Sequence, residues 1–321
     1  MIQEEEHPMG TFVAPLQGKV DVPLSNFALE YRNNAYVADR VLPRVGVLKQ
    51  SDLYAIWGQE MLDDPGDEVR APTAAAIELV QTVSTTNYFC PDHAASRIVA
   101  DEEPSGLASL NRDPYRWAAQ MLLDRVTLLK KESRAMTLLT TAGNYSANNR
   151  TTLTGGKKWS DPLNSDPIGD VETAKDQISL IGTPPNTMVI SRATAHALKV
   201  NASIKARFVT KGGPITMADL VAIFELDVLL ADAVLRTAGV KAKLWPDTAW
   251  IGYVSQTPNQ EDLSFAKTFM WESAPGTAGG ASTEINLVYP ASRKSKSVDV
   301  HMYYDQKITC AEAGYIIIDT N

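Results

Sequence analysis

The sequence predicts an α+β fold in which one long helix, a region of alternating helices and strands, and a final group of strands follow one another. Three observations lead to this prediction. The longest helical pattern of the chain runs from Asn111 to Ala142. Between Asp170 and Ala274, amphipathic helical segments alternate with short apolar runs, and after Gly276 the side chains alternate between polar and apolar as they do in strands.

The composition is that of a globular chain with material for a large core. The chain has 321 residues, of which 44% are hydrophobic, and a formal charge of −8. Proteins that neutralise nucleic-acid phosphates carry clustered Lys and Arg, so this acidic balance argues against that class. The N-terminal residues are acidic where a secretory signal is basic and then apolar, and no run approaches the ~18 apolar residues of a membrane span. We therefore expect a soluble protein made in a cytoplasm.

Residues 1–45 are expected to form an extended N-terminal arm. Prolines recur through the first half of this segment, and neither a helical nor a strand period is sustained. An isolated arm has too few neighbours of its own to bury Phe12 and Leu16. We therefore expect these side chains to lie against another surface, such as that of a neighbouring subunit.

Residues 46–86 are expected to form a long β-hairpin. Leu53–Trp57 is predicted as its outgoing strand and Ala76–Val83 as its returning strand. The tip is rich in Gly and Pro, and its charged residues are Asp63, Asp64, Asp67, Glu68 and Arg70. A long hairpin outside a larger sheet is only marginally stable. It therefore packs either on a neighbouring subunit or back on its own domain, and the sequence leaves both alternatives open.

The long helix is predicted over residues 114–142, as the spine of the fold. Asp113 stands at the N-cap, Pro114 at the first helical position, and Gly143–Asn144 where a left-handed residue ends a helix. The positions expected to form one polar stripe are Arg116, Gln120, Asp124, Thr127, Lys131 and Arg134. The apolar positions expected to pack on both sides are Tyr115, Trp117, Ala118, Met121, Leu122, Val126, Leu128, Leu129, Met136 and Leu139. At 1.5 Å per residue this helix would be roughly 40 Å long.

The remaining segments divide into three regions. Residues 87–169 hold the long helix, preceded by a short helix predicted over Cys90–Pro104. Residues 170–275 are expected to form a compact domain with helices at Val171–Ile181, Ala193–Val200 and Asp219–Leu226 and strands at Thr187–Ile190, Val228–Leu230 and Trp250–Val254. Residues 276–321 are expected to return to the part with the long helix, through strands at Ile285–Tyr289, Ser297–Tyr304 and Tyr315–Ile318.

The sequence contains little that indicates catalysis or metal binding. The four histidines stand in unrelated contexts, and Cys90 and Cys310 have no paired spacing, which favours buried free thiols. His93 follows Cys90 by three residues, which favours a surface pair on a short helix over a nucleophile and its base. The glycines at 155–156 and 276–280 do not match phosphate-binding loops. The acidic hairpin tip lacks the ligand spacing of a calcium loop. We therefore expect no cofactor and no enzymatic activity.

Taken together, the order of these parts resembles that of tailed-phage major capsid proteins of the Hong-Kong-97-type fold. The segment VLPRVGVLKQSDLY (residues 41–54) resembles the start of the family's extended loop, and Arg70-Ala-Pro72 resembles its tip. Further similarities are Tyr88-Phe-Cys90, Asp113 before the spine helix, and the stretches WSDP (159–162) and PNTMVI (185–190). The resemblance covers most of the chain, and it lies in the order of these segments.

The resemblance implies the role of each region. Residues 1–45 would be the N-arm, 46–86 the extended loop, 87–169 the peripheral domain, 170–275 the axial domain, and 276–321 the return to the peripheral domain. The chain would assemble with itself into hexamers and pentamers of an icosahedral shell in the host bacterial cytoplasm. It would enclose DNA without binding it specifically, without contact to a membrane, and with portal, scaffolding and decoration proteins as further partners.

Two alternatives to a phage shell remain, together with one departure from the family. Encapsulin nanocompartments share this fold, and an α/β enzyme with a site in residues 170–275 would share the alternating pattern. Some family members cross-link through a Lys of the extended loop, but the segment Ser51–Thr86 contains no Lys. That cross-link is therefore not expected from this loop.

Overall fold

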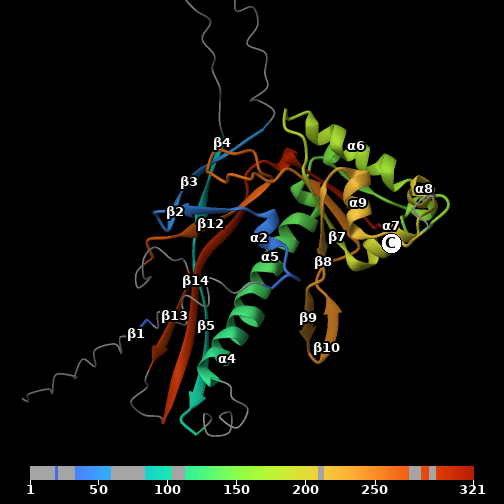
Figure 1. The fold of residues 1–321 in the computed structure, drawn as a ribbon. Coiled ribbons are helices and arrows are strands. Elements are labelled where there is room, and N and C mark those ends of the chain that lie inside the picture. The colour runs from blue at the N-terminus through green and yellow to red at the C-terminus, as the bar shows by residue number, and fades with distance from the viewer. Residues whose placement is uncertain are drawn as a thin grey trace, which may run out of the picture.

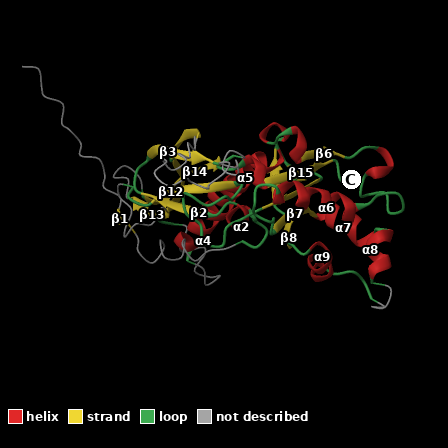
Figure 2. Cartoon of the chain, turned by 90° about the horizontal axis from the view of Figure 1, so that it is seen from above, coloured by secondary structure: helices red, strands yellow, loops and turns green. Residues whose placement is uncertain are grey.

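The computed structural model describes residues 19–20, 33–58, 84–102, 113–208, 213–274, 283–288 and 294–321. In this part of the chain, one long helix lies between a mainly antiparallel sheet on one side and an α/β region on the other (Figure 1). Seen from above, the helices of the α/β region gather at one end and the long strands at the other (Figure 2). The predicted α+β class is therefore confirmed.

The long helix runs without a break from Pro114 to Thr140, but in three segments. These are α4 (Pro114–Met121), a π-helical segment η2 (Leu122–Leu128) and α5 (Leu129–Thr140). The Asp113 side chain accepts a hydrogen bond of 3.0 Å from the backbone N–H of Tyr115, which confirms the predicted N-cap. The predicted C-terminal end is wrong. The helix stops because Thr141 is extended, and Gly143 does not adopt the left-handed conformation.

The π-helical segment explains why the predicted polar stripe fails at Lys131, although Arg134 is exposed as predicted. Each π-type hydrogen bond spans one residue more than an α-type bond, so the residues beyond it are rotated relative to a 3.6-residue period. Lys131, which we placed in the polar stripe, is only 1% exposed, and Glu132 is completely buried. Leu122 and Leu129 are buried as predicted.

In the described part of the chain, helix α4 is covered on one side only, which corrects a second expectation. Trp117 and Met121 were expected inside, but their side chains are 38% and 39% exposed. The α/β region flanks α5 and does not reach α4 (Figure 1). The guanidinium of Arg97 instead lies 4.2 Å from the centroid of the Trp117 ring and partly covers it.

The larger sheet has six strands and carries the long helix on one face. The strands are β1 (Lys19–Val20), β2 (Arg44–Val47), β5 (Asp92–Ala100), β12 (Ala266–Trp271), β13 (Thr283–Val288) and β14 (Ser295–Ile308). β14 is its centre, because β5, β12 and β13 all pair with it in antiparallel register. The buried contact between sheet and helix consists of Val99, Val298 and Val300 against Ala118, Ala119, Leu122 and Leu123.

The short helix predicted over Cys90–Pro104 is wrong, because this segment forms strand β5. Its nine residues pair with β14 from Ser295 to Tyr303. The alternation is that of a strand with one covered face, since Val99 is fully buried and its neighbour Ile98 is 49% exposed. Pairing along a long neighbouring strand outweighs the weak local preference for helix. The expected surface pair of Cys90 and His93 on a helix is wrong for the same reason.

The second sheet has the order β6-β15-β11-β7-β8 and is covered by helices. Its strands are β6 (Arg150–Thr152), β15 (Gly314–Ile318), β11 (Thr248–Gly252), β7 (Thr187–Ser191) and β8 (Asp227–Ala231). The helices are α6 (Pro167–Ser179), α7 (Arg192–Val200), α8 (Ala202–Arg207) and α9 (Met217–Phe224). The helices and strands predicted between residues 170 and 275 are thus present, with ends shifted by a few residues. Their apolar faces share one core around Trp159, Phe224 and Ile251.

The last strand of the chain lies in this second sheet, which differs from our expectation. Tyr315–Ile318 was expected to return to the part with the long helix, but β15 pairs with β11 and β6. β13 and β14 do join the six-stranded sheet as expected. The side chain of Ile316 nevertheless packs in a core that also contains Ala135 and Leu139 of α5, so the two parts share buried surface.

Two separate hairpins and several short elements complete the fold. β3 (Ser51–Ile56) pairs with β4 (Ser84–Phe89), further along the chain than the predicted partner Ala76–Val83, which lies outside the described residues. β9 (Val234–Thr237) pairs with β10 (Val240–Lys243). The short helical elements are α2 (Ala38–Val41) and the 3₁₀ turns Ala142–Asn144, Ala147–Asn149, Gly155–Lys157 and Ala311–Ala313.

Candidate functional site

The residues that we predicted as assembly contacts lie outside the described part of the chain. This applies to Phe12 and Leu16 of the arm and to the hairpin tip, with Asp63, Asp64, Asp67, Glu68 and Arg70. Their role therefore stays a prediction. The structure does describe where the arm and the hairpin join the folded body, and we call this region the junction. It comprises residues 33–47, the strands β3 and β4, and the contacts that they make with α5, β12 and β14.

The hairpin is held at its base by aromatic packing on β12. Tyr54 of β3 and Tyr88 of β4 are both buried against Phe269, with ring centroids 5.1 and 4.8 Å from that of Phe269. The Tyr54 hydroxyl also donates to the backbone carbonyl of Ile308 at 3.2 Å. Two aromatic anchors on one ring give a rigid, mainly apolar attachment.

The arm joins the body through the backbone and side chain of Asp124 in the π-helical segment. Asn33 donates from Nδ2 to the Asp124 carboxylate at 2.7 Å, and the Tyr36 hydroxyl donates to the Asp124 carbonyl at 3.1 Å. The Asp124 carbonyl also accepts the N–H of Leu129, which is the i→i+5 bond of this segment. Asn33 and Tyr36, in the described part of the arm, thus contact the long helix at the π-helical turn.

Glu132 of α5 binds the N-terminal end of α2. Its carboxylate accepts hydrogen bonds from the backbone N–H groups of Val37 at 3.0 Å and Ala38 at 2.7 Å, and from Trp245 Nε1 at 2.8 Å. Burial raises the pKa of Glu132, and these three donors oppose the shift by stabilising the ionised form. One buried carboxylate thus joins the arm, the long helix and the α/β region.

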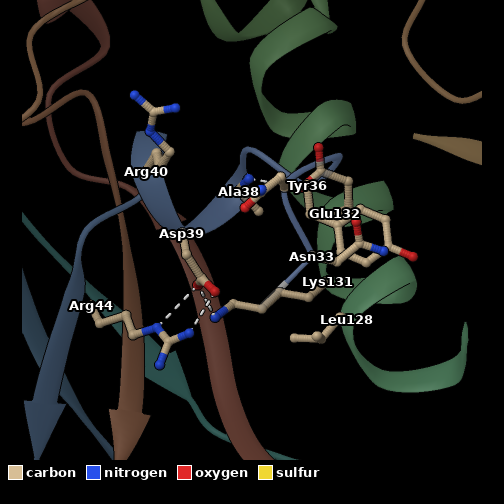
Figure 3. Close-up of a pocket in the computed structure, with 10 residues that line it drawn as sticks. Asn33, Tyr36, Ala38, Asp39, Arg40, Arg44, Leu128, Lys131 and Glu132 are labelled. Atoms are coloured by element: carbon tan, nitrogen blue, oxygen red, sulfur yellow. Dashed lines mark hydrogen bonds and ion pairs between the residues drawn. The ribbon is translucent and has the colours of Figure 1, made fainter. Parts of the chain in front are cut away.

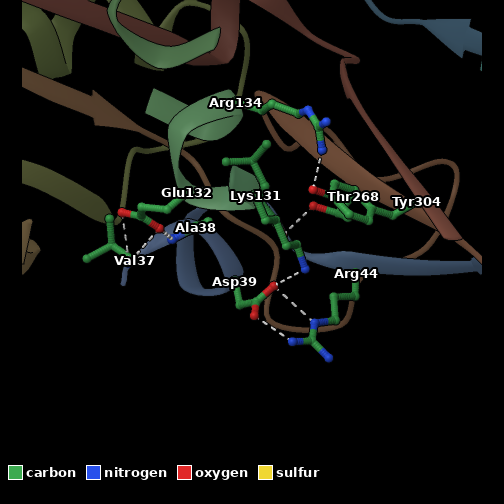
Figure 4. Close-up of polar contacts among 10 residues, drawn as sticks. Val37, Ala38, Asp39, Arg44, Lys131, Glu132, Arg134, Thr268 and Tyr304 are labelled. Carbon is green, nitrogen blue, oxygen red and sulfur yellow. Dashed lines mark hydrogen bonds and ion pairs between the residues drawn. The ribbon is translucent and has the colours of Figure 1, made fainter. Parts of the chain in front are cut away.

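Lys131, the preceding residue, binds the Asp39 side chain, and Asp39 directly follows Ala38 in α2. Its buried ammonium forms an ion pair with the Asp39 carboxylate, which also accepts from Arg44 Nε at 3.1 Å (Figure 4). Burial alone would raise the pKa of Asp39, but Lys131 and Arg44 together hold it well below its ordinary value. A buried ammonium needs such a partner, because an uncompensated charge inside a protein is costly.

Tyr304 of β14 contacts the charged residues of α5 from the six-stranded sheet. The Nζ of Lys131 and the guanidinium of Arg134 each lie 5.5 Å from the centroid of its ring, and Arg134 donates to its hydroxyl at 2.5 Å. The ring of His93 packs on it at a centroid distance of 4.3 Å. Burial raises the pKa of Tyr304 to about 12 and lowers that of His93. Both groups are therefore neutral near pH 7.

A cavity of about 430 Å³ opens beside these charges (Figure 3). Its lining includes Asn33, Tyr36, Asp39, Arg44 and Lys131, from the arm and the long helix. Of the charged groups on its wall, Asp39 pairs with Arg44 and Lys131, and Arg40 pairs with Asp227 outside the cavity. The cavity is thus part of the seam between the arm and the helix, and its polar groups serve the junction.

A second cavity, of about 310 Å³, lies where the α/β alternative would place an active site, at the carboxyl ends of the parallel strands β7 and β8. It is lined by Ser191, His196 and Asp247, among others. Ser191 Oγ lies 3.3 Å from an Asp247 oxygen, but it also accepts the N–H of Thr194 as the N-cap of α7. Among the described residues, no hydrogen bond joins His196 to Ser191 or Asp247. The serine here serves as a helix cap.

A search of the described residues found no group of three or more His, Cys, Asp or Glu side chains placed to hold a metal ion. Cys90 and Cys310 are both buried free thiols, as expected, and burial raises their pKa values to about 12 and about 11. None of the helices in the described ranges combines the length and apolar character needed to cross a membrane.

Sequence reasoning missed the charged residues that matter most in the junction. Lys131 and Glu132 follow one another in a helix, and periodicity places only one of two such neighbours on a given face. Glu132 was not singled out, and Lys131 was assigned to the solvent side. A signal was available in Trp245, since a buried indole N–H needs an acceptor. Lys267, fully buried in β12 and bound to the backbone carbonyls of Gln260 and Asp262, also escaped notice.

Comparison with known proteins gives consistent matches. The model of the family "Phage major capsid protein E" matches residues 118–279. The major capsid protein of Pseudomonas phage JBD67 is 32% identical over 217 residues, which is 65% of this chain and 67% of the relative. The crystal structure of a phage-related protein from Bordetella bronchiseptica RB50 has a TM-score of 0.75 at 23% identity, covering 94% of this chain and 98% of the other. The capsid structure of cyanophage P-SCSP1u has a TM-score of 0.59 at 10% identity, covering 96% and 93%.

Proposed function

The chain belongs to the phage major capsid protein E family, and we propose that it forms the icosahedral head shell of a tailed phage by assembling with itself into hexamers and pentamers. It is a phage coat protein with a Hong-Kong-97-type fold. The shell encloses double-stranded DNA without binding it specifically. Assembly takes place in the host cytoplasm, with portal, scaffolding and decoration proteins as further partners, and the protein carries out no catalysis.

The junction is the observation that supports a mechanism of assembly, beyond membership of the family. It holds the base of the arm and the root of the hairpin on one helix and one sheet, through the buried charges of Lys131 and Glu132 and the aromatic anchors on Phe269. In our proposal, this attachment directs residues 1–18 and 59–83 towards neighbouring subunits, while Lys19–Val20 pairs with β13 of its own subunit. Contacts between copies then supply the surface that an arm and a long hairpin lack by themselves.

The domain roles follow from the same proposal. Residues 87–169 form the peripheral domain and residues 170–275 the axial domain at the centre of each capsomer. Two strands lie across these bounds, because β12 pairs within the six-stranded sheet and β6 within the second sheet. Strand β15 belongs to the axial sheet by its pairing. The family relationship favours a phage shell over an encapsulin compartment, because the matching family model and the 32% identical relative are both phage capsid proteins.

The experiment that tests the proposal is sedimentation of the purified protein followed by electron microscopy of the fast fraction. We expect closed shells of uniform size. A single small oligomer, with no shells over the accessible range of salt and protein concentration, would contradict the proposal. Such an oligomer with a turnover that depends on Ser191 or His196 would support the enzyme alternative instead.

A further inference from the structure

The β9–β10 hairpin is a two-stranded ribbon that stands apart from both larger sheets. Among the described strands it pairs only with itself, and all four residues of β10 are exposed. Figure 1 shows it extending away from the α/β region. Its turn places Ala238 and Gly239 at φ +49° and +87°, as in the tight turns that match the twist of a hairpin. A ribbon of two strands is marginally stable in water, so a contact surface on another molecule would stabilise it.

The charge on this ribbon is opposite in sign to that of the whole chain. Between Ala233 and Pro246 the sequence contains Arg236, Lys241 and Lys243 and no acidic residue, while the chain carries −8. Lys243 binds Asp232 at the base of the ribbon. Arg236 and Lys241 form no ion pair with a described residue.

The strand register places these two cations directly opposite each other. Lys241 is the cross-strand partner of Arg236, and like charges in that position repel each other. Val234 lies on the same face as these cations and is 39% exposed, whereas Val240, 69% exposed, points to the other face of the ribbon. Repelling cations next to an exposed valine form a surface that an acidic protein face would stabilise.

The described part of the chain contains such an acidic face on α6. Glu172 and Asp176 are exposed one helical turn apart, and the Glu225 side chain, 81% exposed, lies nearby. Lys175, between them, contacts Glu172 at 2.9 Å and Glu225 at 4.0 Å. The three carboxylates and one ammonium leave this face with a net negative charge.

The cationic ribbon and the α6 face lie at opposite ends of the α/β region (Figure 1). They are therefore too far apart to bind each other within one copy. Two complementary patches at opposite ends of one chain are what a head-to-tail contact needs, and such contacts close into rings when the rotation between copies allows it.

We propose that the β9–β10 hairpin of one subunit docks on the α6 face of a second copy of this chain, with Arg236 and Lys241 binding Glu172 and Asp176. The inference rests on the proposed function, because it assigns one contact within the shell. It favours a second copy over DNA because the exposed Val234, on the same face as the two cations, adds an apolar contact that a phosphate backbone does not offer.

The test compares the charge reversal R236E/K241E with the matched control K205E/R207E. Both variants replace two exposed cations of the α/β region by two anions, so they change the net charge equally. We expect R236E/K241E to keep the wild-type circular dichroism and melting temperature while its shell yield falls roughly tenfold or more. The control should assemble like the wild type. The neutral variant R236Q/K241Q introduces no new charge and should show a smaller loss of shell yield. If R236E/K241E does not fold, the shell yield of R236Q/K241Q tests the inference instead.

A rescue experiment identifies the partner surface. Adding E172K/D176K to R236E/K241E should restore assembly, because it exchanges the signs of the two faces, whereas E172K/D176K alone should assemble poorly. Normal shells from R236E/K241E or R236Q/K241Q would overturn the inference. This holds even if these variants no longer retain linear double-stranded DNA in a filter-binding assay, because the hairpin would then bind DNA and not a second copy. If adding E172K/D176K does not restore the assembly that R236E/K241E loses, the α6 face is not the acceptor surface. A wild type without shells would overturn the proposed function as well.

Discussion

Lys131 and Glu132 are adjacent on the long helix, and both are buried, yet they hold different parts of the arm. Glu132 binds the backbone N–H groups of Val37 and Ala38 at the start of α2, and Lys131 binds the side chain of the next residue, Asp39. Both charges are matched by groups on the arm, so the arm base and the helix stabilise each other. Removing one partner would leave a buried group unsatisfied, which costs more than the bond itself contributes.

The first prediction concerns the Glu132 carboxylate. In Glu132→Gln the side chain keeps its size, but the new NH₂ group faces backbone and indole donors and cannot accept from them. We expect the free energy of unfolding to fall by about 2 kcal/mol or more. The measurement is urea unfolding of the unassembled protein, with Glu261→Gln as the control, because Glu261 is exposed and its replacement should change stability by less than about 0.5 kcal/mol. Equal stability of both variants would contradict the role assigned to Glu132.

The second prediction concerns acid unfolding through Asp39. Its pKa in the folded protein lies below the ordinary value of 3.8, because Lys131 and Arg44 stabilise the carboxylate. As the pH falls below about 4, the unfolded chain takes up this proton first, so the stability from Asp39 is present above that pH and is lost below it. Asp39→Asn should therefore be less stable at neutral pH and should lose less stability on acidification.

Urea midpoints measured from about pH 6 to about pH 3 check this prediction, with the exposed Asp101→Asn as the control. Glu132 contributes with the opposite sign, since its raised pKa makes the folded state lose stability as the pH rises through the ordinary value of 4.5. Parallel pH profiles of wild type and Asp39→Asn would show that the ion pair with Lys131 does not contribute.

At the scale of elements, the long helix joins two environments by changing its geometry. Among the described residues, only one face of α4 is covered, and the six-stranded sheet covers it. Helix α5 contacts the arm and packs against strands of both sheets. The arm contacts the helix at the π-helical turn, through Asp124. The change of geometry thus coincides with the change of neighbours.

The third prediction distinguishes the covered and open faces of this helix. Leu122→Asp places a charge among Val298, Val300 and Leu123, where burial without a partner costs several kcal/mol, so we expect the protein to fail to fold. Met121→Asp is the matched control, one residue earlier and 39% exposed, and we expect it to fold normally. Soluble yield and thermal melting of the two variants test this. A Leu122→Asp protein with an unchanged melting temperature would mean that the orientation of the helix is wrong.

The fourth prediction concerns the hairpin tip. Deleting Met61–Val69, or replacing Arg70 by Glu, should leave circular dichroism and melting temperature nearly unchanged, because exposed loop tips contribute little to the stability of their own domain. The yield of shells from these variants should fall sharply. In the wild type, added salt should lower the yield of shells, because the tip is rich in charged residues and salt screens their contacts. Sedimentation of wild type and variants side by side measures the effect. A normal yield of shells from the deletion would show that the tip is not an assembly contact.

The sequence predicted those elements whose signals are local. The N-cap at Asp113, the helices of the α/β region and the strand Thr187–Ser191 are specified by their own side chains. The strand Asp92–Ala100 and the place of Tyr315–Ile318 were missed because each depends on a partner far along the chain. The buried Lys131 was missed because a π-helical segment has no simple sequence signature and shifts every later position.

At the scale of the whole molecule, the described fold is a rigid body with attachment points for segments that extend from it. The long helix lies between the two sheets and shares a core with both (Figure 1). The arm base attaches to α5 and the hairpin root to β12, and the β9–β10 ribbon extends from the α/β region. The order of arm, hairpin, long helix and α/β region was predicted from composition and periodicity, whereas the β9–β10 ribbon was not predicted.

The measurement that tests the central claim most directly is a cryo-electron microscopy map of the particles formed by the wild-type protein. We expect a closed icosahedral shell in which the body, with its helix from Pro114 to Thr140, repeats in every subunit. Density for residues 1–18 and 59–83 should then lie on neighbouring copies, while Lys19–Val20 pairs with β13 of its own subunit. A discrete small oligomer, or a map in which residues 1–18 and 59–83 fold back on their own subunit, would contradict the account.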